Sequence, residues 1–164
     1  RAHAGVSARF LGHLTDAPLA FPRLQKLETV LPERQAARAH DARPFELRPL
    51  APRLPGPVAF LADERTAGAG ERILSLVAFH RLAAIVGDTT AGIHGNANGM
   101  WIPDGTFLRW TASRTRRPDD SVVVAAGVEP TLRVRPRAQD LAEGGDRVLE
   151  AAADLLRRQS SGAP

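Results

Sequence analysis

The sequence contains no cysteine among its 164 residues, and this absence removes two kinds of site. Neither a disulfide framework nor a thiolate metal site can form without cysteine. The compartment stays open, because exported and cytosolic proteins without cysteine both exist. No pair of histidines has the spacing of helical metal ligands, so we expect no metal site. Nothing in the sequence indicates a cofactor.

Long apolar runs are also absent. No uninterrupted apolar stretch approaches the roughly 20 residues that a membrane-spanning helix needs, so we expect no membrane span. The chain begins at Arg1 and shows no basic start, apolar stretch and small-residue cleavage site of the kind that marks a signal peptide. We therefore expect a fragment or processed form whose upstream part is missing.

Lysine is nearly absent, since Lys26 is the only one and the net charge of +4 comes from arginine. One alternative function is nucleic-acid binding through the basic residues of the C-terminal third. These are Arg114, Arg116, Arg117, Arg133, Arg135 and Arg137. They alternate or flank turns, as on a solvated strand face, and lack the interleaved exposed aromatics of nucleic-acid surfaces. We therefore expect no nucleic-acid partner.

The composition, 43% hydrophobic and 24% charged, is that of one soluble globular domain. Apolar residues at helical spacing between Val6 and Leu14 predict an opening helix, which prolines end within residues 1–22. Eight of the thirteen prolines lie from Pro18 to Pro57. We therefore interpret residues 23–56 as an irregular connector with at most one strand, over 24–30.

Residues 57–158 carry the pattern of a core. An apolar strand over 58–62, a small-residue turn over 66–70, a mostly apolar helix over 71–82 and a strand over 84–86 follow one another. This order is typical of a parallel strand–helix–strand unit. A tight turn that leads into a buried helix N-terminus can present backbone N–H groups to an anionic ligand or transition state.

The remainder of the core reads as strands and a closing helix. A hairpin over 99–112 turns at Pro103-Asp104-Gly105, and Trp101 and Trp110 are predicted to be core or cross-strand aromatics. Short strands are expected at 122–124 and 132–135. Asp146 is a plausible N-cap for a helix with a clean apolar stripe. Residues 159–164 should form a frayed tail.

Four motifs in register carry a family resemblance. They are P-V-A-F-L-A-D-E-R-T-A-G-A-G-E (57–71), A-A-I-V-G-D-T-T-A-G (83–92), W-I-P-D-G (101–105) and G-V-E-P-T-L-R-V (127–134). Their order and spacing resemble the serine peptidases grouped as tail-specific or C-terminal-processing proteases, tricorn core protease and interphotoreceptor retinoid-binding protein. The loop at 90–92 is more similar to the tricorn-like and retinoid-binding branch.

The resemblance implies an α/β fold with a ClpP/crotonase-like ββα core, a trailing β-hairpin and a closing helix. It also implies a mechanism, in which a serine at the N-terminus of the buried helix attacks the peptide carbonyl. The amide after the nucleophile and a glycine amide from another loop hold the oxyanion. A lysine about 25 residues on, or a histidine from elsewhere, acts as the base.

The sequence departs from this pattern at both catalytic positions. The serine position is Gly68, which has no side chain to form an acyl-enzyme, and the lysine position falls on Ile93. Ser75 lies two turns into the helix and Thr66 is two residues off register, so neither takes the serine's place. The strand that supplies the second oxyanion amide in the family precedes Arg1.

Of the groups that hold the oxyanion in the family, the turn keeps the backbone amide of Ala69. The resemblance also implies substrate contacts at Thr90 and Gly92. His94 is a weak candidate for a base and Glu129 a weak candidate for an acid. In both cases a plain loop residue is the competing interpretation. Glu71 opens the helix, where capping is the default role of a carboxylate.

These observations predict the C-terminal part of a tail-specific-protease-like serine peptidase domain that is inactive because its nucleophile position is Gly68. The alternative is a non-catalytic peptide- or lipid-binding module on the same fold. The expected partner is a peptide or protein, as substrate or ligand, in extended form. The resemblance suggests a periplasmic or exported bacterial protein.

Overall fold

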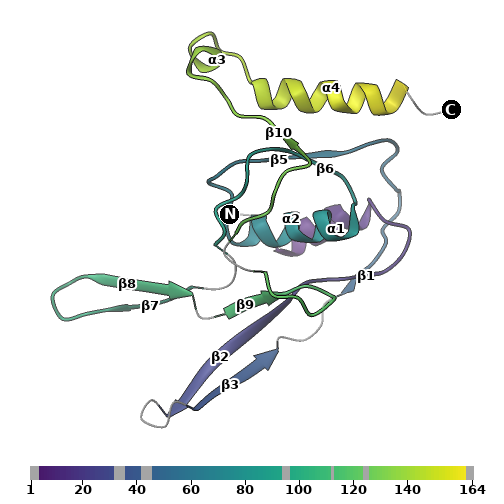
Figure 1. The fold of residues 1–164 in the computed structure, drawn as a ribbon. Coiled ribbons are helices and arrows are strands. Elements are labelled where there is room, and N and C mark those ends of the chain that lie inside the picture. The colour runs from purple at the N-terminus through teal and green to yellow at the C-terminus, as the bar shows by residue number, and fades with distance from the viewer. Residues whose placement is uncertain are drawn as a thin grey trace.

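The computed structural model describes residues 4–31, 36–41, 46–93, 97–111, 113–123 and 126–161. Its centre is a mixed α/β unit (Figure 1) in which β5 (Ala59–Ala62) runs parallel to β6 (Ala84–Gly87), with α2 (Ala69–His80) as the crossover. The short strand β10 (Leu132–Arg133) pairs parallel with the other edge of β6. The predicted strand–helix–strand unit is confirmed.

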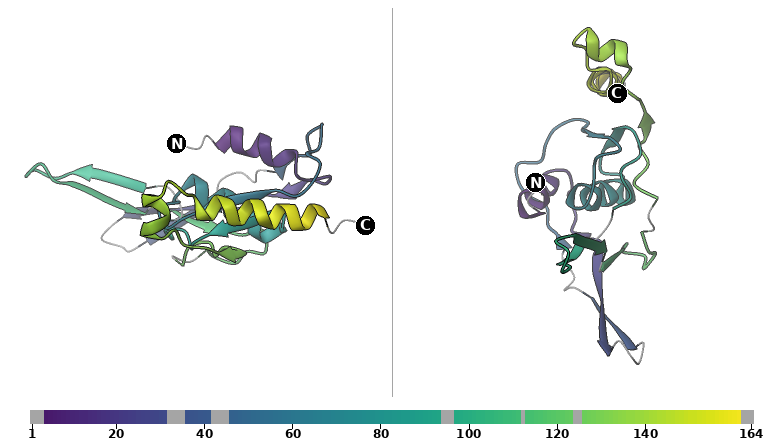
Figure 2. Two further views of the ribbon diagram at one scale, coloured as in Figure 1. Left: turned by 90° about the horizontal axis from the view of Figure 1, so that it is seen from above. Right: turned by 90° about the vertical axis from the view of Figure 1, so that its left-hand side faces the viewer.

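Helix α2 is buried on two sides. It lies between the sheet of β5, β6 and β10 and a second sheet that contains β2 (Arg23–Leu31) and β9 (Ser113–Arg116) (Figures 1 and 2). Its buried apolar side chains are Leu74, Leu76 and Val77. The helix ends at Arg81, whose φ of 53° takes the backbone out of the helix. An apolar helix between two layers forms the centre of the core.

The rest of the core is built around α2. Helix α1 (Ala4–Gly12) contacts α2 and β4 (Glu46–Leu47), which pairs with β1 (Leu19–Ala20). Helix α4 (Arg147–Ser161) contacts β5 and β6 from the opposite face of the sheet (Figure 2). The largest fully buried apolar side chains come from these layers: Leu11, Leu47, Leu76, Ile85, Val77 and Val86.

The predicted irregular connector over 23–56 is wrong in its first half. The strand expected at 24–30 is present as β2, and β3 (Ala36–Asp41) pairs with it in antiparallel register. The sequence pattern did not predict this sheet, because the other partner of β2 is β9, which lies about ninety residues later in the chain. Between β4 and β5 the chain is irregular, as expected.

The hairpin of β7 (Ala97–Trp101) and β8 (Phe107–Thr111) is confirmed. Asp146 caps α4 as predicted, since the Leu149 N–H donates to its Oδ1 at 3.0 Å. The frayed tail is wrong over residues 159–161, which are helical. Of the strand expected at 122–124, residue 124 lies outside the described residues, and Val122 forms a single bridge with Arg116. Helix α3 (Ala138–Ala142) was not anticipated.

The two tryptophans are not core residues. Trp101 is 70% exposed and Trp110 46% exposed, so the core assignment is wrong. The cross-strand assignment is confirmed for Trp101, whose ring lies 4.9 Å from that of Phe107 on the facing strand. Over the part of the chain that the structure describes, every helix is too short or too polar to cross a membrane.

Candidate functional site

The turn between β5 and α2 has an unusual backbone at Gly68, with φ 59° and ψ −112°. L-residues rarely adopt this conformation, and holding one there costs about 1–3 kcal/mol. The space around the turn is nonetheless open, since a Cβ built on Gly68 would meet no atom within 4 Å. The turn therefore has room for a side chain at this position but favours glycine through its backbone.

The positions that the resemblance assigns to serine and lysine lie next to each other in space. The Gly68 N–H donates to the backbone carbonyl of Ile93 at 3.0 Å. The Ile93 side chain is 55% exposed. The loop after β6 therefore runs against the turn, although neither position holds a reactive side chain.

The amide that follows Gly68 is unpaired within the described residues. Ala69 is the first residue of α2, and its N–H donates no hydrogen bond to any of them. Helix N-termini present such N–H groups, which together with the helix dipole favour an anionic group. This is the amide that the sequence analysis selected for an oxyanion.

A buried carboxylate joins three segments at the turn. Glu71 is fully buried, and its Oε1 accepts hydrogen bonds from the Thr90 hydroxyl at 2.5 Å and from the Gly92 N–H at 2.6 Å. Its Oε2 accepts from the Gly68 N–H at 3.3 Å, which is the half of a capping box that a glycine N-cap allows. The Thr90 hydroxyl in turn accepts from the Val128 N–H at 2.8 Å.

This network goes beyond the sequence prediction. Capping by Glu71 was expected from its place in the first turn, but its bonds to Thr90 and Gly92 were not. Spacing along the chain could not show them, because they depend on how the loops after β5, β6 and residue 126 meet. Thr90 and Gly92 both donate hydrogen bonds to Glu71, and their contact with substrate stays a prediction.

The other candidate residues are spread around the turn. His94 lies outside the described residues. Glu129 is exposed in the loop that follows Val128. The Thr66 hydroxyl donates to Asp63 Oδ1 at 2.9 Å, and Ser75 is only 3% exposed, so neither projects into the open space beside Gly68. His80 lies on α2, with its Nε2 3.1 Å from the carbonyl oxygen of Ala20.

An apolar cavity of about 440 Å³ opens beside the turn. Thr66 and Gly70 form its edge at the turn, and apolar side chains of α1, β5 and α2 form its walls. These side chains are Val6, Phe10, Leu11, Phe60, Leu61, Ile73 and Leu74. Phe10 and Phe60 meet edge to face with ring centroids 6.1 Å apart. The cavity could accept an apolar side chain or an acyl chain.

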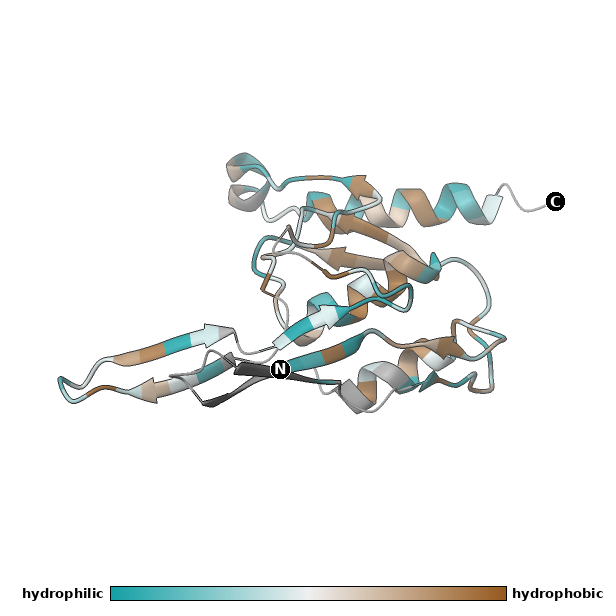
Figure 3. Cartoon of the chain, turned by 60° about the horizontal axis from the view of Figure 1, so that its bottom comes forward, coloured by the Kyte–Doolittle hydropathy of each residue, from teal (hydrophilic) through white to brown (hydrophobic). Residues whose placement is uncertain are grey.

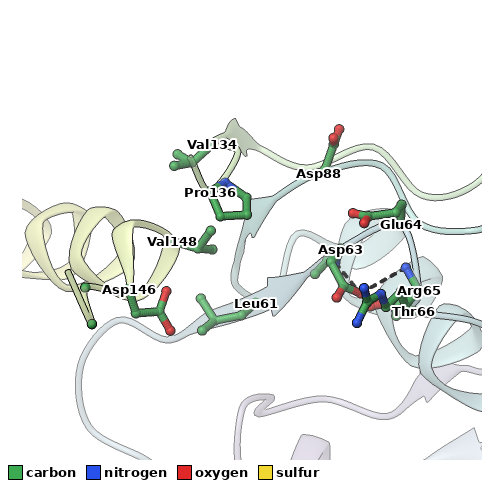
Figure 4. Close-up of a pocket in the computed structure, with 13 residues that line it drawn as sticks. Leu61, Asp63, Glu64, Arg65, Thr66, Asp88, Val134, Pro136, Asp146 and Val148 are labelled. Carbon is green, nitrogen blue, oxygen red and sulfur yellow. Dashed lines mark hydrogen bonds between the residues drawn. The ribbon is translucent and has the colours of Figure 1, made fainter. Parts of the chain in front are cut away.

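A second pocket, of about 790 Å³, lies on the other side of β5 (Figure 4). Its rim includes Asp63, Glu64 and Asp146, and Asp88 lies at one end. Arg135 and Arg133 form ion pairs with Asp88, and the hydrogen bond from Arg135 is the largest cause that lowers the pKa of Asp88 from its ordinary value of 3.8. Among the described residues, no group of acidic or histidine side chains is placed to hold a metal ion.

Solved structures of other proteins share this fold. A putative peptidase from Parabacteroides merdae superposes with a TM-score of 0.73 at 20% identity, covering 94% of this chain and 48% of that one. Mature CPAF complexed with lactacystin superposes with a TM-score of 0.68 at 17% identity, covering 94% of this chain and 40% of that one. A putative S41 protease from Bacteroides fragilis superposes with a TM-score of 0.60 at 15% identity, covering 95% of this chain and 42% of that one. At these identities the likeness shows the fold.

Residues 12–134 match peptidase family S41, and the chain belongs to this family. The resemblance to tail-specific proteases is thereby confirmed, as is the α/β core. A comparison with curated proteins found no match. The chain spans less than half the length of the three solved structures named above.

Proposed function

We propose that this chain supplies the C-terminal part of an S41 peptidase domain and does not hydrolyse peptides by the serine mechanism of the family. The observation that supports the proposal is the turn at Gly68, the position that the resemblance assigns to the nucleophile, where open space surrounds a residue without a side chain. Loss of the nucleophile costs a serine peptidase about six orders of magnitude in rate.

The surroundings of Gly68 support the same conclusion. A serine needs a base within hydrogen-bond reach, and the adjacent position is Ile93, which has no proton acceptor on its side chain. The Ala69 amide and the helix N-terminus can still stabilise a negative charge. The turn retains the electrostatic part of the site without the nucleophile or the base.

A hydrolysis assay tests this proposal. The purified chain is incubated with casein and with a set of apolar peptides, and separately with a serine-reactive fluorophosphonate. We expect no turnover and no labelling. Turnover that follows the protein through the gel-filtration peak would overturn the proposal.

The matched variants are Gly68→Ser and Gly68→Ser combined with Ile93→Lys. The single variant supplies a hydroxyl without a base, so we expect at most slow labelling. The double variant supplies both groups at adjacent positions, and we expect its labelling to exceed that of the single variant at least tenfold. Equal labelling would argue that Ile93 does not stand at the position of the base.

The apolar cavity supports a second candidate function, the binding of an extended peptide through one apolar side chain. The cavity lies at the Gly68 turn, and its volume of about 440 Å³ falls within the range of small-ligand pockets. Binding of this kind needs neither a nucleophile nor a base.

Isothermal titration with peptides that end in apolar residues tests the second candidate. We expect Phe10→Ser, in the cavity wall, to weaken binding about tenfold. Leu54→Ser, at an equally accessible apolar residue away from the cavity, should leave it unchanged. Absence of heat at millimolar peptide would contradict the proposal, and displacement of peptide by a fatty acid would indicate an acyl-chain site instead.

A further inference from the structure

The β7–β8 hairpin stands apart from the two larger sheets. Within the described residues, β7 pairs with β8 only, and the pair projects away from the layers that hold the core (Figures 1 and 2). A two-stranded hairpin is at best marginally stable in water, and further strands or packing against another element are needed to stabilise it. No described element provides either along most of the hairpin.

Both faces of the hairpin carry exposed apolar side chains. Residues directly opposite in an antiparallel pair share a face, so Trp101 and Phe107 lie together on one side. By the same register, Met100 and Leu108 lie on the other side, which they share with Trp110. Their exposed fractions run from 45% for Leu108 to 70% for Trp101. Figure 3 shows the hydrophobic stretches along the projecting strands.

The exposed apolar side chains on the two faces of the hairpin present part of the area that a stable interface uses. Aromatic side chains bury about 150–250 Å² each, so these five partly exposed residues present an area on the order of 500 Å². A standard interface buries about 800 Å² on each partner, with the apolar patch at its centre and polar groups around it. The hairpin therefore supplies part of the apolar centre of a dimer contact, divided between its two faces.

The outer edge of β7 lacks the devices that keep edge strands apart. Exposed edges are usually protected by charged residues, prolines or bulges. Residues 97–101 contain no charged residue and no proline. The whole hairpin, residues 97–111, contains one aspartate, Asp104, and one arginine, Arg109, so its net charge is −1 + 1 = 0, although the chain carries +4. Two copies would not repel each other at this surface.

We propose that the hairpin is a self-association surface, at which the β7 edges of two copies pair antiparallel about Gly99 into a four-stranded sheet. The contact is self-complementary, as a two-fold axis requires. In this register Trp101 of one copy stands opposite Ala97 of the other, and Met100 opposite Asn98. Each large side chain meets a smaller one, and glycine at the axis lets the two backbones approach.

Sedimentation velocity and intrinsic fluorescence test the proposal on the same samples. Both tryptophans of the chain lie on the hairpin, so tryptophan emission reports on this element alone. We expect the mass to rise with concentration from 17.6 kDa towards twice that value, with a parallel blue shift of the emission. A constant mass and a constant emission maximum would overturn the proposal.

A pair of charge variants tests the register. The two position-100 side chains would lie diagonally across the axis, roughly 7–8 Å apart. Met100→Lys and Met100→Glu should each weaken self-association at least tenfold, and an equal mixture of the two should restore it. Failure of the mixture to associate would contradict the pairing about Gly99.

Leu149→Lys is the matched control, because Leu149 is an equally exposed apolar residue on α4. It should associate like the unmodified chain, and far-UV circular dichroism should show all variants folded. Equal loss of association in Leu149→Lys would overturn the assignment to the hairpin. An emission shift on adding an apolar peptide, with the mass still monomeric, would assign the surface to peptide binding and overturn it as well.

Discussion

Replacement of Glu71 by leucine is expected to lower the free energy of unfolding by about 3 kcal/mol or more. The carboxylate is fully buried and accepts hydrogen bonds from the Thr90 hydroxyl and the Gly92 N–H. Leucine has a similar volume but no acceptor, so the buried Thr90 hydroxyl and the half-buried Gly92 N–H would both lose this partner. The Gly68 N–H would keep one acceptor, because it also donates to the carbonyl of Ile93. Urea unfolding followed by far-UV circular dichroism measures the loss.

Two further variants separate the hydrogen bonds from other effects. Glu71→Gln keeps one acceptor oxygen for Thr90 and Gly92, and we expect it to lose less than half as much stability as Glu71→Leu. Glu150→Leu, at an exposed glutamate in the first turn of α4, should change stability by less than about 0.5 kcal/mol. If Glu71→Leu were as stable as the unmodified chain, the network would not hold the loops together.

Hydrogen exchange gives a local measure of the same prediction. The Gly92 and Val128 amides lie on two different loops, and both are joined to Glu71, the second one through Thr90. In Glu71→Leu, both should exchange faster than amides in the hairpin, whose described strands pair only with each other. Uniform acceleration across the chain would indicate global destabilisation and no specific role in tying the loops.

The second large effect is expected at Gly87, where Gly87→Ala should cost about 4 kcal/mol or more and reduce the soluble yield. Gly87 ends β6 with φ 132°, and a Cβ there would fall onto the backbone carbonyl of Ala62 on the neighbouring strand. That carbonyl also accepts the Asp88 N–H at 2.9 Å, so the strands cannot separate without losing this bond. Thermal unfolding of the soluble fraction measures the effect.

Gly68→Ala is the control for this prediction, because it shares the positive φ but not the collision. The Cβ at Gly68 meets nothing within 4 Å, so only the backbone cost of about 1–3 kcal/mol applies. The difference between the two variants isolates the steric contribution at Gly87. Equal destabilisation would mean that β5 and β6 can move apart at little cost.

Local patterns in the sequence predicted the part of the fold that depends on near neighbours. The run of β5, the small-residue turn, the apolar face of α2 and the turn of the β7–β8 hairpin were all visible as periodicity and turn residues. The position of Gly68 at the start of the helix followed from the same stretch. These features form through contacts within about thirty residues of chain, so their signals lie close together.

Other features depended on segments far apart in the sequence. The pairing of β2 with β9 gave regular structure to a stretch that reads as an irregular connector. The solvent exposure of the two tryptophans likewise could not be predicted, because an alternating apolar strand has the same sequence pattern whether or not a second layer covers it. In this chain no described element covers the hairpin along most of its length, and both indole rings are exposed.

The sequence by itself determined the residue types: glycine stands at the position that the resemblance assigns to the nucleophile, and isoleucine at the one that it assigns to the lysine. Only the tertiary structure decided that these two positions touch through the Gly68 N–H and the Ile93 carbonyl, and that Glu71 ties three segments together. The physical reason is that a buried hydrogen bond is specified by the meeting of loops in space. No spacing along the chain encodes that meeting.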